Sequence, residues 1–248
     1  MQRYRNLIDD WNKFRQESQE PITRTVRKNP LKAGEDFEQR LKQNFKQVEE
    51  SEWNPEVYRL PETKKPGDSV LHWRGEYYVQ EESASLPVKI LKPKENDEIL
   101  DMCAAPGGKT TQIAAAIKNN GKIIANDQSS KRLQSLTANK YRTGSAAAAT
   151  TNYDARNLPE NQKYDKILLD APCSGEADRA RRNFEAADKE EIKNLSKLQK
   201  QLIEKAEKLL KDDGTLVYST CTIAPEENEA VVKHATEETD LKLKHAET

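Results

Sequence analysis

From about residue 76 onward, the hydrophobic positions of the chain follow two alternating patterns. Short runs rich in Ile, Leu and Val are separated by longer stretches in which apolar residues recur at every third or fourth position. Strand-like runs that alternate with helical stretches are typical of βα units, which build a parallel sheet. The predicted strands are 97–102, 121–127, 145–152, 164–170 and 214–220, and the clearest predicted helices are 108–118, 129–144 and 189–211.

Two of these elements depend on single features. The run 145–152 is rich in alanine, which is a poor strand former, but a strand there preserves the alternation. The helix 129–144 is expected to end on Gly144, because glycine readily adopts the left-handed conformation of a helix C-cap.

The first 75 residues show a different, mixed pattern. Pro55, Pro61 and the pair Pro66–Gly67 mark turns that separate this part from the βα pattern. We therefore expect a small α+β accessory domain, residues 1–75, and a larger α/β domain, residues 76–248. The elements predicted in the first domain are a helix near 4–14, a strand in 24–32 and a helix in 34–48.

The composition is that of a highly charged globular protein. Hydrophobic residues make up 35% and charged residues 33% of the 248 positions, so most of the charge must lie on solvated surfaces. No window approaches the roughly 18 consecutive apolar residues of a membrane span. The polar N-terminal stretch also lacks the apolar core of a signal peptide. We expect a cytoplasmic protein.

The net charge gives no general argument for a nucleic-acid partner. It is formally -1, whereas a strongly basic chain would favour nucleic acid. Two local clusters are basic, and each is compatible with a phosphate-facing patch or with an ordinary solvated surface. These clusters are Arg24, Arg27, Lys28 and Lys32 in the first domain, and Arg179, Arg181 and Arg182 in the second.

The three cysteines, Cys103, Cys173 and Cys221, are widely spaced and accompanied by only three histidines. This spacing indicates neither a disulfide framework nor a zinc site, and no metal is expected. Each thiol is then either a small packed group or a nucleophile. Cys173 and Cys221 follow the fourth and fifth predicted strands, at the sheet edge where parallel sheets bind ligands. These two thiols are the candidates for reaction.

The loop after the first predicted strand, CAAPGGKTT, has the features of a cofactor loop. Pro106, Gly107 and Gly108 form a tight turn at a helix N-terminus, where the backbone can approach a ligand closely. A phosphate-binding P-loop would need glycine where Cys103 stands, and the GxGxxG pattern of dinucleotide sites is absent. A looser glycine turn suits an adenosine-type cofactor such as S-adenosylmethionine.

Two acids after later strands extend this cofactor site. Asp127 ends the second strand about 20 residues beyond the glycines, where an acid accepts hydrogen bonds from ribose hydroxyls in dinucleotide folds. Asp154 follows the third strand and is placed for the adenine edge. Either acid could instead cap a helix N-terminus.

The chemistry of Asp170, Cys173 and Cys221 suits methylation of a pyrimidine at carbon 5. A thiolate that adds to carbon 6 makes carbon 5 nucleophilic, and a second group then removes the carbon 5 proton. The helix expected just after Cys221 could supply the positive terminus that an ionised thiol needs. A cysteine hydrolase would need a histidine partner, but none of the histidines follows a predicted strand.

Together these motifs resemble the Nol/Nop/Sun family of RNA cytosine-5 methyltransferases, especially its archaeal tRNA-modifying members. The motifs LDMCAAPGGKTTQIA, ANDQSSKRL, NYDARN, LLDAPCSGE and YSTCTIAPEENEAVV occur in the order and spacing of that family. YYVQEESASLP and RTVRKNPLK resemble its upstream segments. The resemblance implies a Rossmann-like, S-adenosylmethionine-dependent catalytic domain with a mostly parallel sheet, preceded by a small RNA-binding α+β domain.

The resemblance also implies roles for individual residues. Cys221 is the nucleophile that bonds carbon 6, Cys173 assists product release, and Asp170 holds the cytosine near its ring nitrogen and amino group. The residues alone leave the order of the two cysteines open. Cys103 belongs to the cofactor loop as a packed group. The implied cofactor-binding residues are Cys103, Ala104, Ala105, Pro106, Gly107, Gly108, Lys109, Asp127, Arg132, Asp154 and Asp170.

The expected substrate is structured RNA, with tRNA favoured. The alternatives are methylation of rRNA and a noncatalytic RNA-binding or assembly role. The segment ADRARRNFEAAD after CSGE departs from the family pattern, which puts target contacts there in doubt. Family members also continue into a final strand pair, which is expected to be absent here, with an exposed sheet edge as the consequence.

Overall fold

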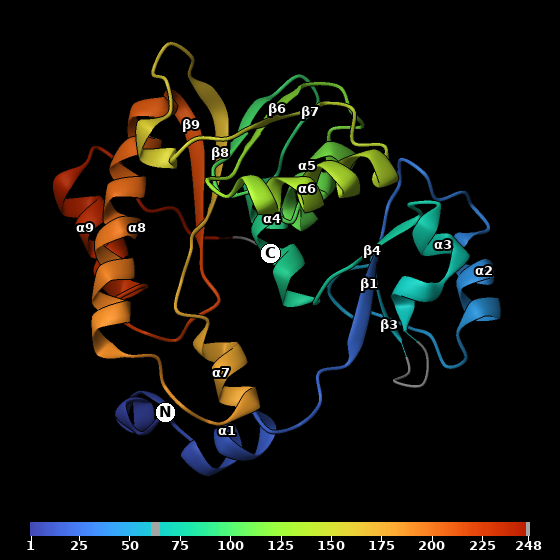
Figure 1. Cartoon of the computed structure of the whole chain (residues 1–248), viewed down its shortest axis with the longest axis horizontal. Coiled ribbons are helices and arrows are strands. Elements are labelled where there is room, and N and C mark those ends of the chain that lie inside the picture. The colour runs from blue at the N-terminus through green and yellow to red at the C-terminus, as the bar shows by residue number, and fades with distance from the viewer. Residues whose placement is uncertain (61–64, 247–248) are drawn as a thin grey trace.

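The computed structural model describes residues 1–60 and 65–246 and contains two sheets (Figure 1). The larger sheet has five strands in the order β7-β6-β5-β8-β9, and every neighbouring pair is parallel. The predicted α/β fold with a parallel sheet is confirmed, including the alanine-rich strand. The strands are β5 (Glu98–Asp101), β6 (Lys122–Asn126), β7 (Ala148–Thr151), β8 (Tyr164–Asp170) and β9 (Leu210–Ser219).

Helices cover both faces of this sheet because successive side chains of each strand point to opposite faces. Ile167 and Leu169 of β8 pack in one core cluster with α8 and α9, whereas Leu168 packs in another with α4 and α5. Helix α6 ends at Gly144, which has the predicted left-handed conformation with φ 74°. The helices are α4 (Leu86–Leu91), α5 (Gly108–Ala116), α6 (Ser130–Thr143), α8 (Lys189–Leu209) and α9 (Glu229–Glu238).

The smaller sheet is antiparallel, in the order β2-β3-β1-β4. Its core contains Val26, Phe37 and Tyr77, which are each 0% exposed. Strand β4 lies just beyond residue 75, so the small sheet takes in residues on the far side of the expected domain boundary. The elements are β1 (Arg24–Lys28), β2 (Glu49–Glu50), β3 (Val57–Leu60), β4 (Tyr77–Val79), α2 (Phe37–Asn44), α3 (Val70–Trp73), η2 (Pro66–Asp68) and η3 (Ser83–Ser85).

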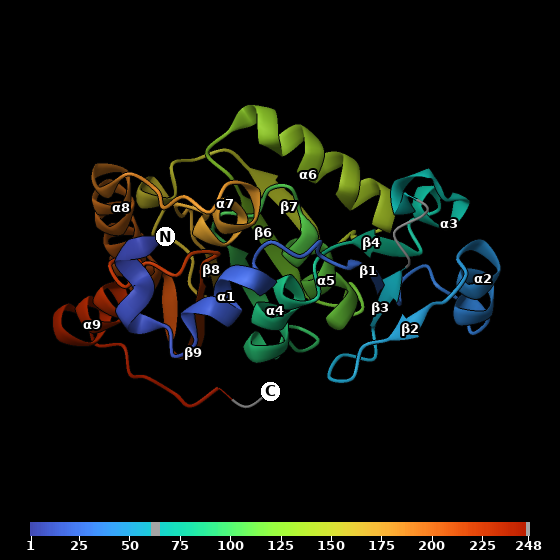
Figure 2. The same cartoon turned by 90° about the horizontal axis from the view of Figure 1, so that it is seen from below.

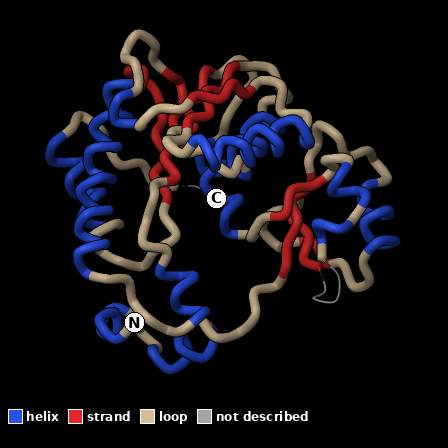
Figure 3. Tube along the Cα trace, viewed as in Figure 1, coloured by secondary structure: helices blue, strands red, loops and turns tan. Residues whose placement is uncertain are grey.

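The first 20 residues lie away from the small sheet, as the trace in Figure 3 and the view in Figure 2 show. In place of one helix near residues 4–14, there are two short helical segments, and Asp10 caps the second by accepting from the Lys13 backbone N–H at 2.9 Å. Met1 and Tyr4 are buried against residues of α7 and α8. The segments are η1 (Gln2–Leu7), α1 (Trp11–Glu17) and α7 (Glu176–Arg182), and η4 (Ala155–Asn157) is the remaining short helix.

Strand β1 joins the two sheets through buried side chains. Asn29, directly after β1, is 2% exposed and donates to the carbonyls of Gly75 at 2.7 Å and Thr143 at 2.8 Å. Arg27 donates to the Gly108 carbonyl at 2.8 Å. The small sheet is therefore fixed both to the end of α6 and to the start of α5. Among the residues described, no helix is both long and apolar enough to cross a membrane.

We predict that Asn29→Ala destabilises the protein by about 1–3 kcal/mol, because two buried carbonyl acceptors lose their donor. Urea unfolding monitored by circular dichroism measures the change. Asn183→Ala is the matched control, since the Asn183 amide is exposed and bonds only to Glu185 among the described residues. Equal stability of the two variants would contradict the proposed junction.

Candidate active site

The loops that follow β8 and β9 bring two cysteines together. The two strands are parallel neighbours, with Asp170 paired to Ser219 at their carboxyl ends. Cys173 and Cys221 lie just beyond these positions, and their Sγ atoms are 2.9 Å apart. The Cys221 backbone N–H also donates to the Cys173 sulfur at 3.2 Å. The structure thus brings together the two thiols that the sequence singles out.

The two thiols differ in how readily they ionise. A hydrogen bond from the Cys221 thiol, helped by the backbone N–H groups of Cys221 and Gly175, lowers the pKa of Cys173 to about 7, although burial opposes the shift. The same contact and burial raise the pKa of Cys221. Above about pH 7 the pair therefore holds one proton, with the negative charge on Cys173.

The predicted help from a helix terminus is wrong. Helix α9 begins at Glu229, well past Cys221, and the residues between them are irregular up to Ala224 and form turns from Pro225 to Asn228. The charge on the thiol is stabilised instead by the neighbouring thiol and by loop backbone N–H groups. The apolar pattern of the segment after Cys221 did not distinguish a turn from the first turn of a helix.

Asp170 connects the thiol loops to the cofactor loop. Its Oδ2 forms an ion pair with Lys109 Nζ at 2.7 Å, and its Oδ1 accepts from the Ser219 hydroxyl at 2.8 Å. The side chain of Asp170 is 36% exposed, so it can still meet a ligand.

A cavity of about 240 Å³ lies between the cofactor loop and strand β4. Gly107, which does not line this cavity, has a φ of 104°, and a Cβ at this position would lie 2.8 Å from the Leu136 side chain, which explains the glycine. Of the predicted cofactor residues, the cavity is lined by Cys103, Ala104, Ala105, Pro106, Gly108, Lys109 and Asp170, and the remaining lining residues are Tyr78, Val79, Gln80, Ala84 and Asp101.

Cys103 lies in this cavity wall as a packed group. It is partly buried against the core cluster that contains Leu100 and Met102. Burial and nearby carboxylates raise its pKa to about 12. A thiol with such a pKa is not a nucleophile at neutral pH.

Four predicted cofactor residues stand outside the cavity lining: Gly107, Asp127, Arg132 and Asp154. Asp127 is 3% exposed and accepts from the backbone N–H groups of Ala105 at 3.1 Å and Ser129 at 2.9 Å. Arg132 forms an ion pair with it at 3.3 Å. These contacts hold the cofactor loop against the start of α6.

In this structure Asp154 caps a helix, which was the alternative to binding the adenine edge. It accepts from the Arg156 backbone N–H at 3.0 Å as the N-cap of η4, and it forms an ion pair with the Arg156 guanidinium at 2.5 Å. Helix α6, in contrast, is capped by Ser129 rather than by Asp127.

Asp101 is a site residue that the sequence analysis missed. It ends β5, lines the cavity and is 1% exposed. Its Oδ2 accepts from the Thr110 hydroxyl at 2.7 Å, whereas its buried Oδ1 has no hydrogen-bond partner among the described residues. Burial raises the pKa of Asp101 to about 7. Its position as the acid that ends the first strand was the signal that could have identified it.

Arg27 is a second residue whose place the sequence did not reveal. It is 2% exposed, so its reading as part of a phosphate-facing patch is wrong. Besides Gly108, it donates to Thr111 Oγ1 at 3.1 Å and Gln112 Oε1 at 3.2 Å, and burial lowers its pKa to about 10. An arginine of the small sheet therefore braces the helix that follows the cofactor loop.

The second basic cluster is largely neutralised by ion pairs. Arg179 pairs with Glu191 at 2.9 Å. Arg181 pairs with Glu81 at 3.3 Å, and Arg182 pairs with Asp178 at 2.7 Å. To contact RNA phosphates, these arginines would have to leave their carboxylate partners or bind both groups at once.

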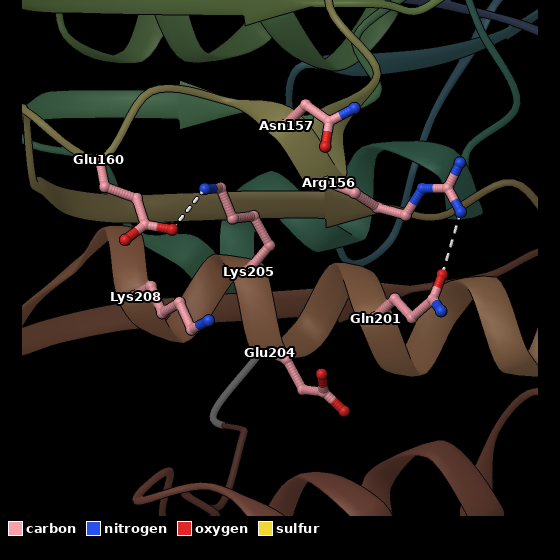
Figure 4. Close-up of a pocket in the computed structure, with 7 residues that line it drawn as sticks. All are labelled: Arg156, Asn157, Glu160, Gln201, Glu204, Lys205 and Lys208. Carbon is pink, nitrogen blue, oxygen red and sulfur yellow. Dashed lines mark hydrogen bonds and ion pairs between the residues drawn. The ribbon is translucent and has the colours of Figure 1, made fainter.

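A larger hollow of about 350 Å³, shown in Figure 4, lies between η4 and α8. Most of its charged groups already have ion-pair partners: Lys205 pairs with Glu160 at 2.6 Å, Arg156 with Asp154 at 2.5 Å, and Glu204 with His234 at 2.8 Å. It contains none of the predicted site residues and neither thiol. The reactive groups therefore belong to the smaller cavity and the loops beside it.

The parallel sheet, the glycine turn after its first strand and the paired thiols define a Rossmann-like methyltransferase. The family model described as 16S rRNA methyltransferase RsmB/F matches residues 88–248, and the model of the N-terminal domain of 16S rRNA methyltransferase RsmF matches residues 1–82. The chain belongs to the RsmB/F methyltransferase family.

Curated relatives agree with this family. The chain is 40% identical over 233 residues to the ribosomal RNA small subunit methyltransferase F of Aliivibrio fischeri, and 39% identical over 241 residues to that of Vibrio atlanticus. The alignments cover 88% and 92% of this chain but 48% and 50% of those proteins. The chain thus spans about half the length of the curated relatives it matches.

Solved structures also match over nearly the whole chain. A methyltransferase homologue from Pyrococcus horikoshii aligns with a TM-score of 0.81 and 35% identity, covering 93% of this chain and 75% of that one. NSun6 from Pyrococcus horikoshii, solved with SFG, aligns with a TM-score of 0.86 and 26% identity, covering 96% of this chain and 86% of that one.

We predict that iodoacetamide alkylates Cys173 with an inflection near pH 7, because its thiolate is present above that pH and lost below it. Cys103 should stay unmodified from pH 6 to about 9 because of its raised pKa. Peptide mass spectrometry follows each thiol. Cys221→Ala should move the Cys173 inflection up toward the usual thiol pKa of about 8.5, whereas Cys221→Ser keeps a donor and should move it less. If Cys221→Ala leaves the pH midpoint of Cys173 alkylation unchanged, the two thiols do not share a proton.

Proposed function

We propose that the chain methylates carbon 5 of cytosine in RNA with S-adenosylmethionine as the methyl donor. The observation that carries this proposal is the pair of thiols 2.9 Å apart at the end of a methyltransferase sheet. Asp170, which also lines the cofactor-loop cavity, lies at the end of one of the two strands that carry these thiols. Membership of the RsmB/F family supports the same reaction class.

Small-subunit rRNA is the substrate that we propose. The family model and the curated relatives all carry names of small-subunit rRNA methyltransferases. These names favour the rRNA alternative of the sequence analysis over the tRNA expectation.

The cavity residues fit S-adenosylmethionine. Asp101 offers a buried carboxylate oxygen that has no donor within residues 1–60 and 65–246, which suits the ammonium group of the methionine part. The glycine turn lets the backbone approach the ligand closely, and the likeness to a structure solved with SFG supports this choice. When bound, S-adenosylmethionine supplies an electrophilic methyl group. Asp127 and Arg132 hold the loop, and Asp154 would have to exchange its bond with Arg156 to meet adenine.

The two thiols divide the remaining chemistry. The Cys173 thiolate takes the proton of Cys221, and the Cys221 sulfur bonds carbon 6 of the cytosine. Asp170 accepts a hydrogen bond from the amino group of the cytosine, next to its ring nitrogen, and carbon 5 takes the methyl group. Cys173 passes its proton to solvent and then accepts the carbon 5 proton. The bond between Cys221 and carbon 6 breaks, which restores the aromatic ring and the free thiolate.

We also propose that residues 1–75 form an RNA-binding accessory domain and residues 76–248 the catalytic domain. The separate model match of the first 82 residues supports a distinct first unit. Tyr78 and Gln80 fall within this match, in β4 and its continuation, and line the cofactor cavity. RNA held by the first unit would therefore lie beside the methyl donor.

We predict that the protein transfers tritium from labelled S-adenosylmethionine to small-subunit rRNA and leaves tRNA unlabelled. Separate rRNA and tRNA transcripts, counted after acid precipitation, measure the transfer. Nuclease digestion should place the label in 5-methylcytidine. Label in tRNA alone would contradict the rRNA proposal and support tRNA as the substrate. No label in either RNA would favour a noncatalytic RNA-binding role.

We further predict that Cys173→Ala accumulates a covalent complex with rRNA in the presence of S-adenosylmethionine, because release lacks its base. Removal of the neighbouring thiol also removes the contact that raises the pKa of Cys221 most, although burial still raises it, so the complex should form faster as pH rises. Denaturing gel electrophoresis detects the complex. Cys221→Ala should form no covalent complex. If Cys221→Ala forms the complex and Cys173→Ala does not, Cys173 is the nucleophile and Cys221 assists product release.

A further inference from the structure

A buried polar bridge lies directly behind the two thiols. Ser174 follows Cys173, Thr222 follows Cys221, and the hydroxyl oxygens of Ser174 and Thr222 are 2.9 Å apart. Ser174 is 4% exposed and Thr222 is 9% exposed. The distance between the thiol loops is therefore set by a hydroxyl contact one residue further along each chain segment.

Glu227 anchors this bridge. It is 0% exposed, and its Oε2 accepts from the Ser174 backbone N–H at 3.1 Å, while its Oε1 accepts from the Ser174 hydroxyl. Because the Ser174 hydroxyl donates to Glu227, its oxygen is left to accept from Thr222. The chain of hydrogen bonds thus runs from Thr222 through Ser174 to a single carboxylate.

A third donor ties the other side of Cys173 to the same carboxylate. Gln199 of α8 donates to Glu227 Oε2 at 2.8 Å and to the Pro172 carbonyl at 2.9 Å. The residues before and after Cys173 are therefore both fixed, directly or through Gln199, to Glu227. The loop around this thiol has little freedom to move independently of the carboxylate.

A carboxylate is the group that this arrangement requires. Three donors converge on Glu227, and an ionised carboxylate is an acceptor on both oxygens, whereas a glutamine would turn an NH₂ group toward some of these donors. No Lys, Arg or His forms an ion pair with Glu227 within residues 1–60 and 65–246. Burial of an unpaired carboxylate costs several kcal/mol unless hydrogen bonds offset it. Simple core packing would not call for a charge here.

We propose that Glu227 is a positioning residue, which holds the Cys173 and Cys221 loops at reacting distance through Ser174 and Thr222. This inference rests on the proposed function, since it concerns the same thiol pair. Glu227 touches neither the substrate nor the reacting sulfurs and acts through the two hydroxyls. Glu176 flanks the far end of the bridge, with its Oε2 3.3 Å from the Thr222 hydroxyl oxygen, whose one hydrogen is directed to Ser174.

The test uses phenylarsine oxide, a trivalent arsenical that bridges two adjacent thiols. Two As–S bonds form and one water leaves, so tight binding reports that Cys173 and Cys221 are close, without RNA or S-adenosylmethionine. We expect the wild-type chain to bind one arsenical per molecule in native mass spectrometry. Glu227→Gln should weaken this binding at least about tenfold and lower rRNA methylation by a similar or larger factor, because small misplacement of reacting groups is costly.

Two matched comparisons separate positioning from general stability. Glu229→Gln changes an exposed carboxylate two positions away and should leave both measurements unchanged. Thr222→Val keeps the side-chain shape but removes the bridging hydroxyl, whereas Thr222→Ser keeps it. We expect Thr222→Val to weaken arsenical binding and Thr222→Ser to retain it, so the inference can be tested even if Glu227→Gln fails to fold.

The outcomes distinguish this inference from the proposed function. Wild-type arsenical affinity in both Glu227→Gln and Thr222→Val would overturn the positioning role, whatever happens to methylation. Loss of arsenical binding in Thr222→Val but not in Thr222→Ser supports it. If the wild-type chain binds the arsenical but methylates no RNA, the proposed function fails while the positioning of the thiols stands.

Discussion

The parallel pairing of β8 with β9 is the constraint on which the active site depends. Asp170 and Ser219 are paired where the two strands end, and the thiols of Cys173 and Cys221 follow directly, 2.9 Å apart. A shift of one residue in this register would turn the strand ends to opposite faces of the sheet. Two groups that are far apart in sequence therefore share one proton because of backbone hydrogen bonds in the sheet.

The two sheets build the cofactor cavity together. Arg27 of the small sheet is buried against the start of α5, and Asn29 joins the same strand to the end of α6. Tyr78 and Gln80 complete the cavity wall. Among the residues that the structure describes, no carboxylate contacts the buried Arg27 guanidinium, and neutral acceptors at the start of α5 satisfy it. The first unit is thus a structural part of the site as well as a candidate RNA-binding unit.

Much of the fold could be predicted from the sequence because hydrophobic periodicity reports which faces are buried. The five parallel strands, the long amphipathic helix after Cys173 and the glycine cap at Gly144 all follow from local patterns. Contacts made only in the folded chain could not be predicted. The basic segment around Arg27 has the same composition whether it is buried or exposed, and the ionisation of Cys173 depends on a thiol 48 residues away. The role of Asp154 could not be predicted either, because it depends on whether Asp154 pairs with Arg156 in the folded chain.

The most direct test of the account is to identify the sulfur that bonds the RNA in the wild-type chain. Small-subunit rRNA transcribed with 5-fluorocytosine has no proton at carbon 5 to lose, so a methylated adduct cannot release the enzyme. After incubation with S-adenosylmethionine, digestion and peptide mass spectrometry should find the nucleotide on the peptide that contains Cys221. A nucleotide on the Cys173 peptide, or methylated rRNA with no thiol adduct at all, would contradict the account.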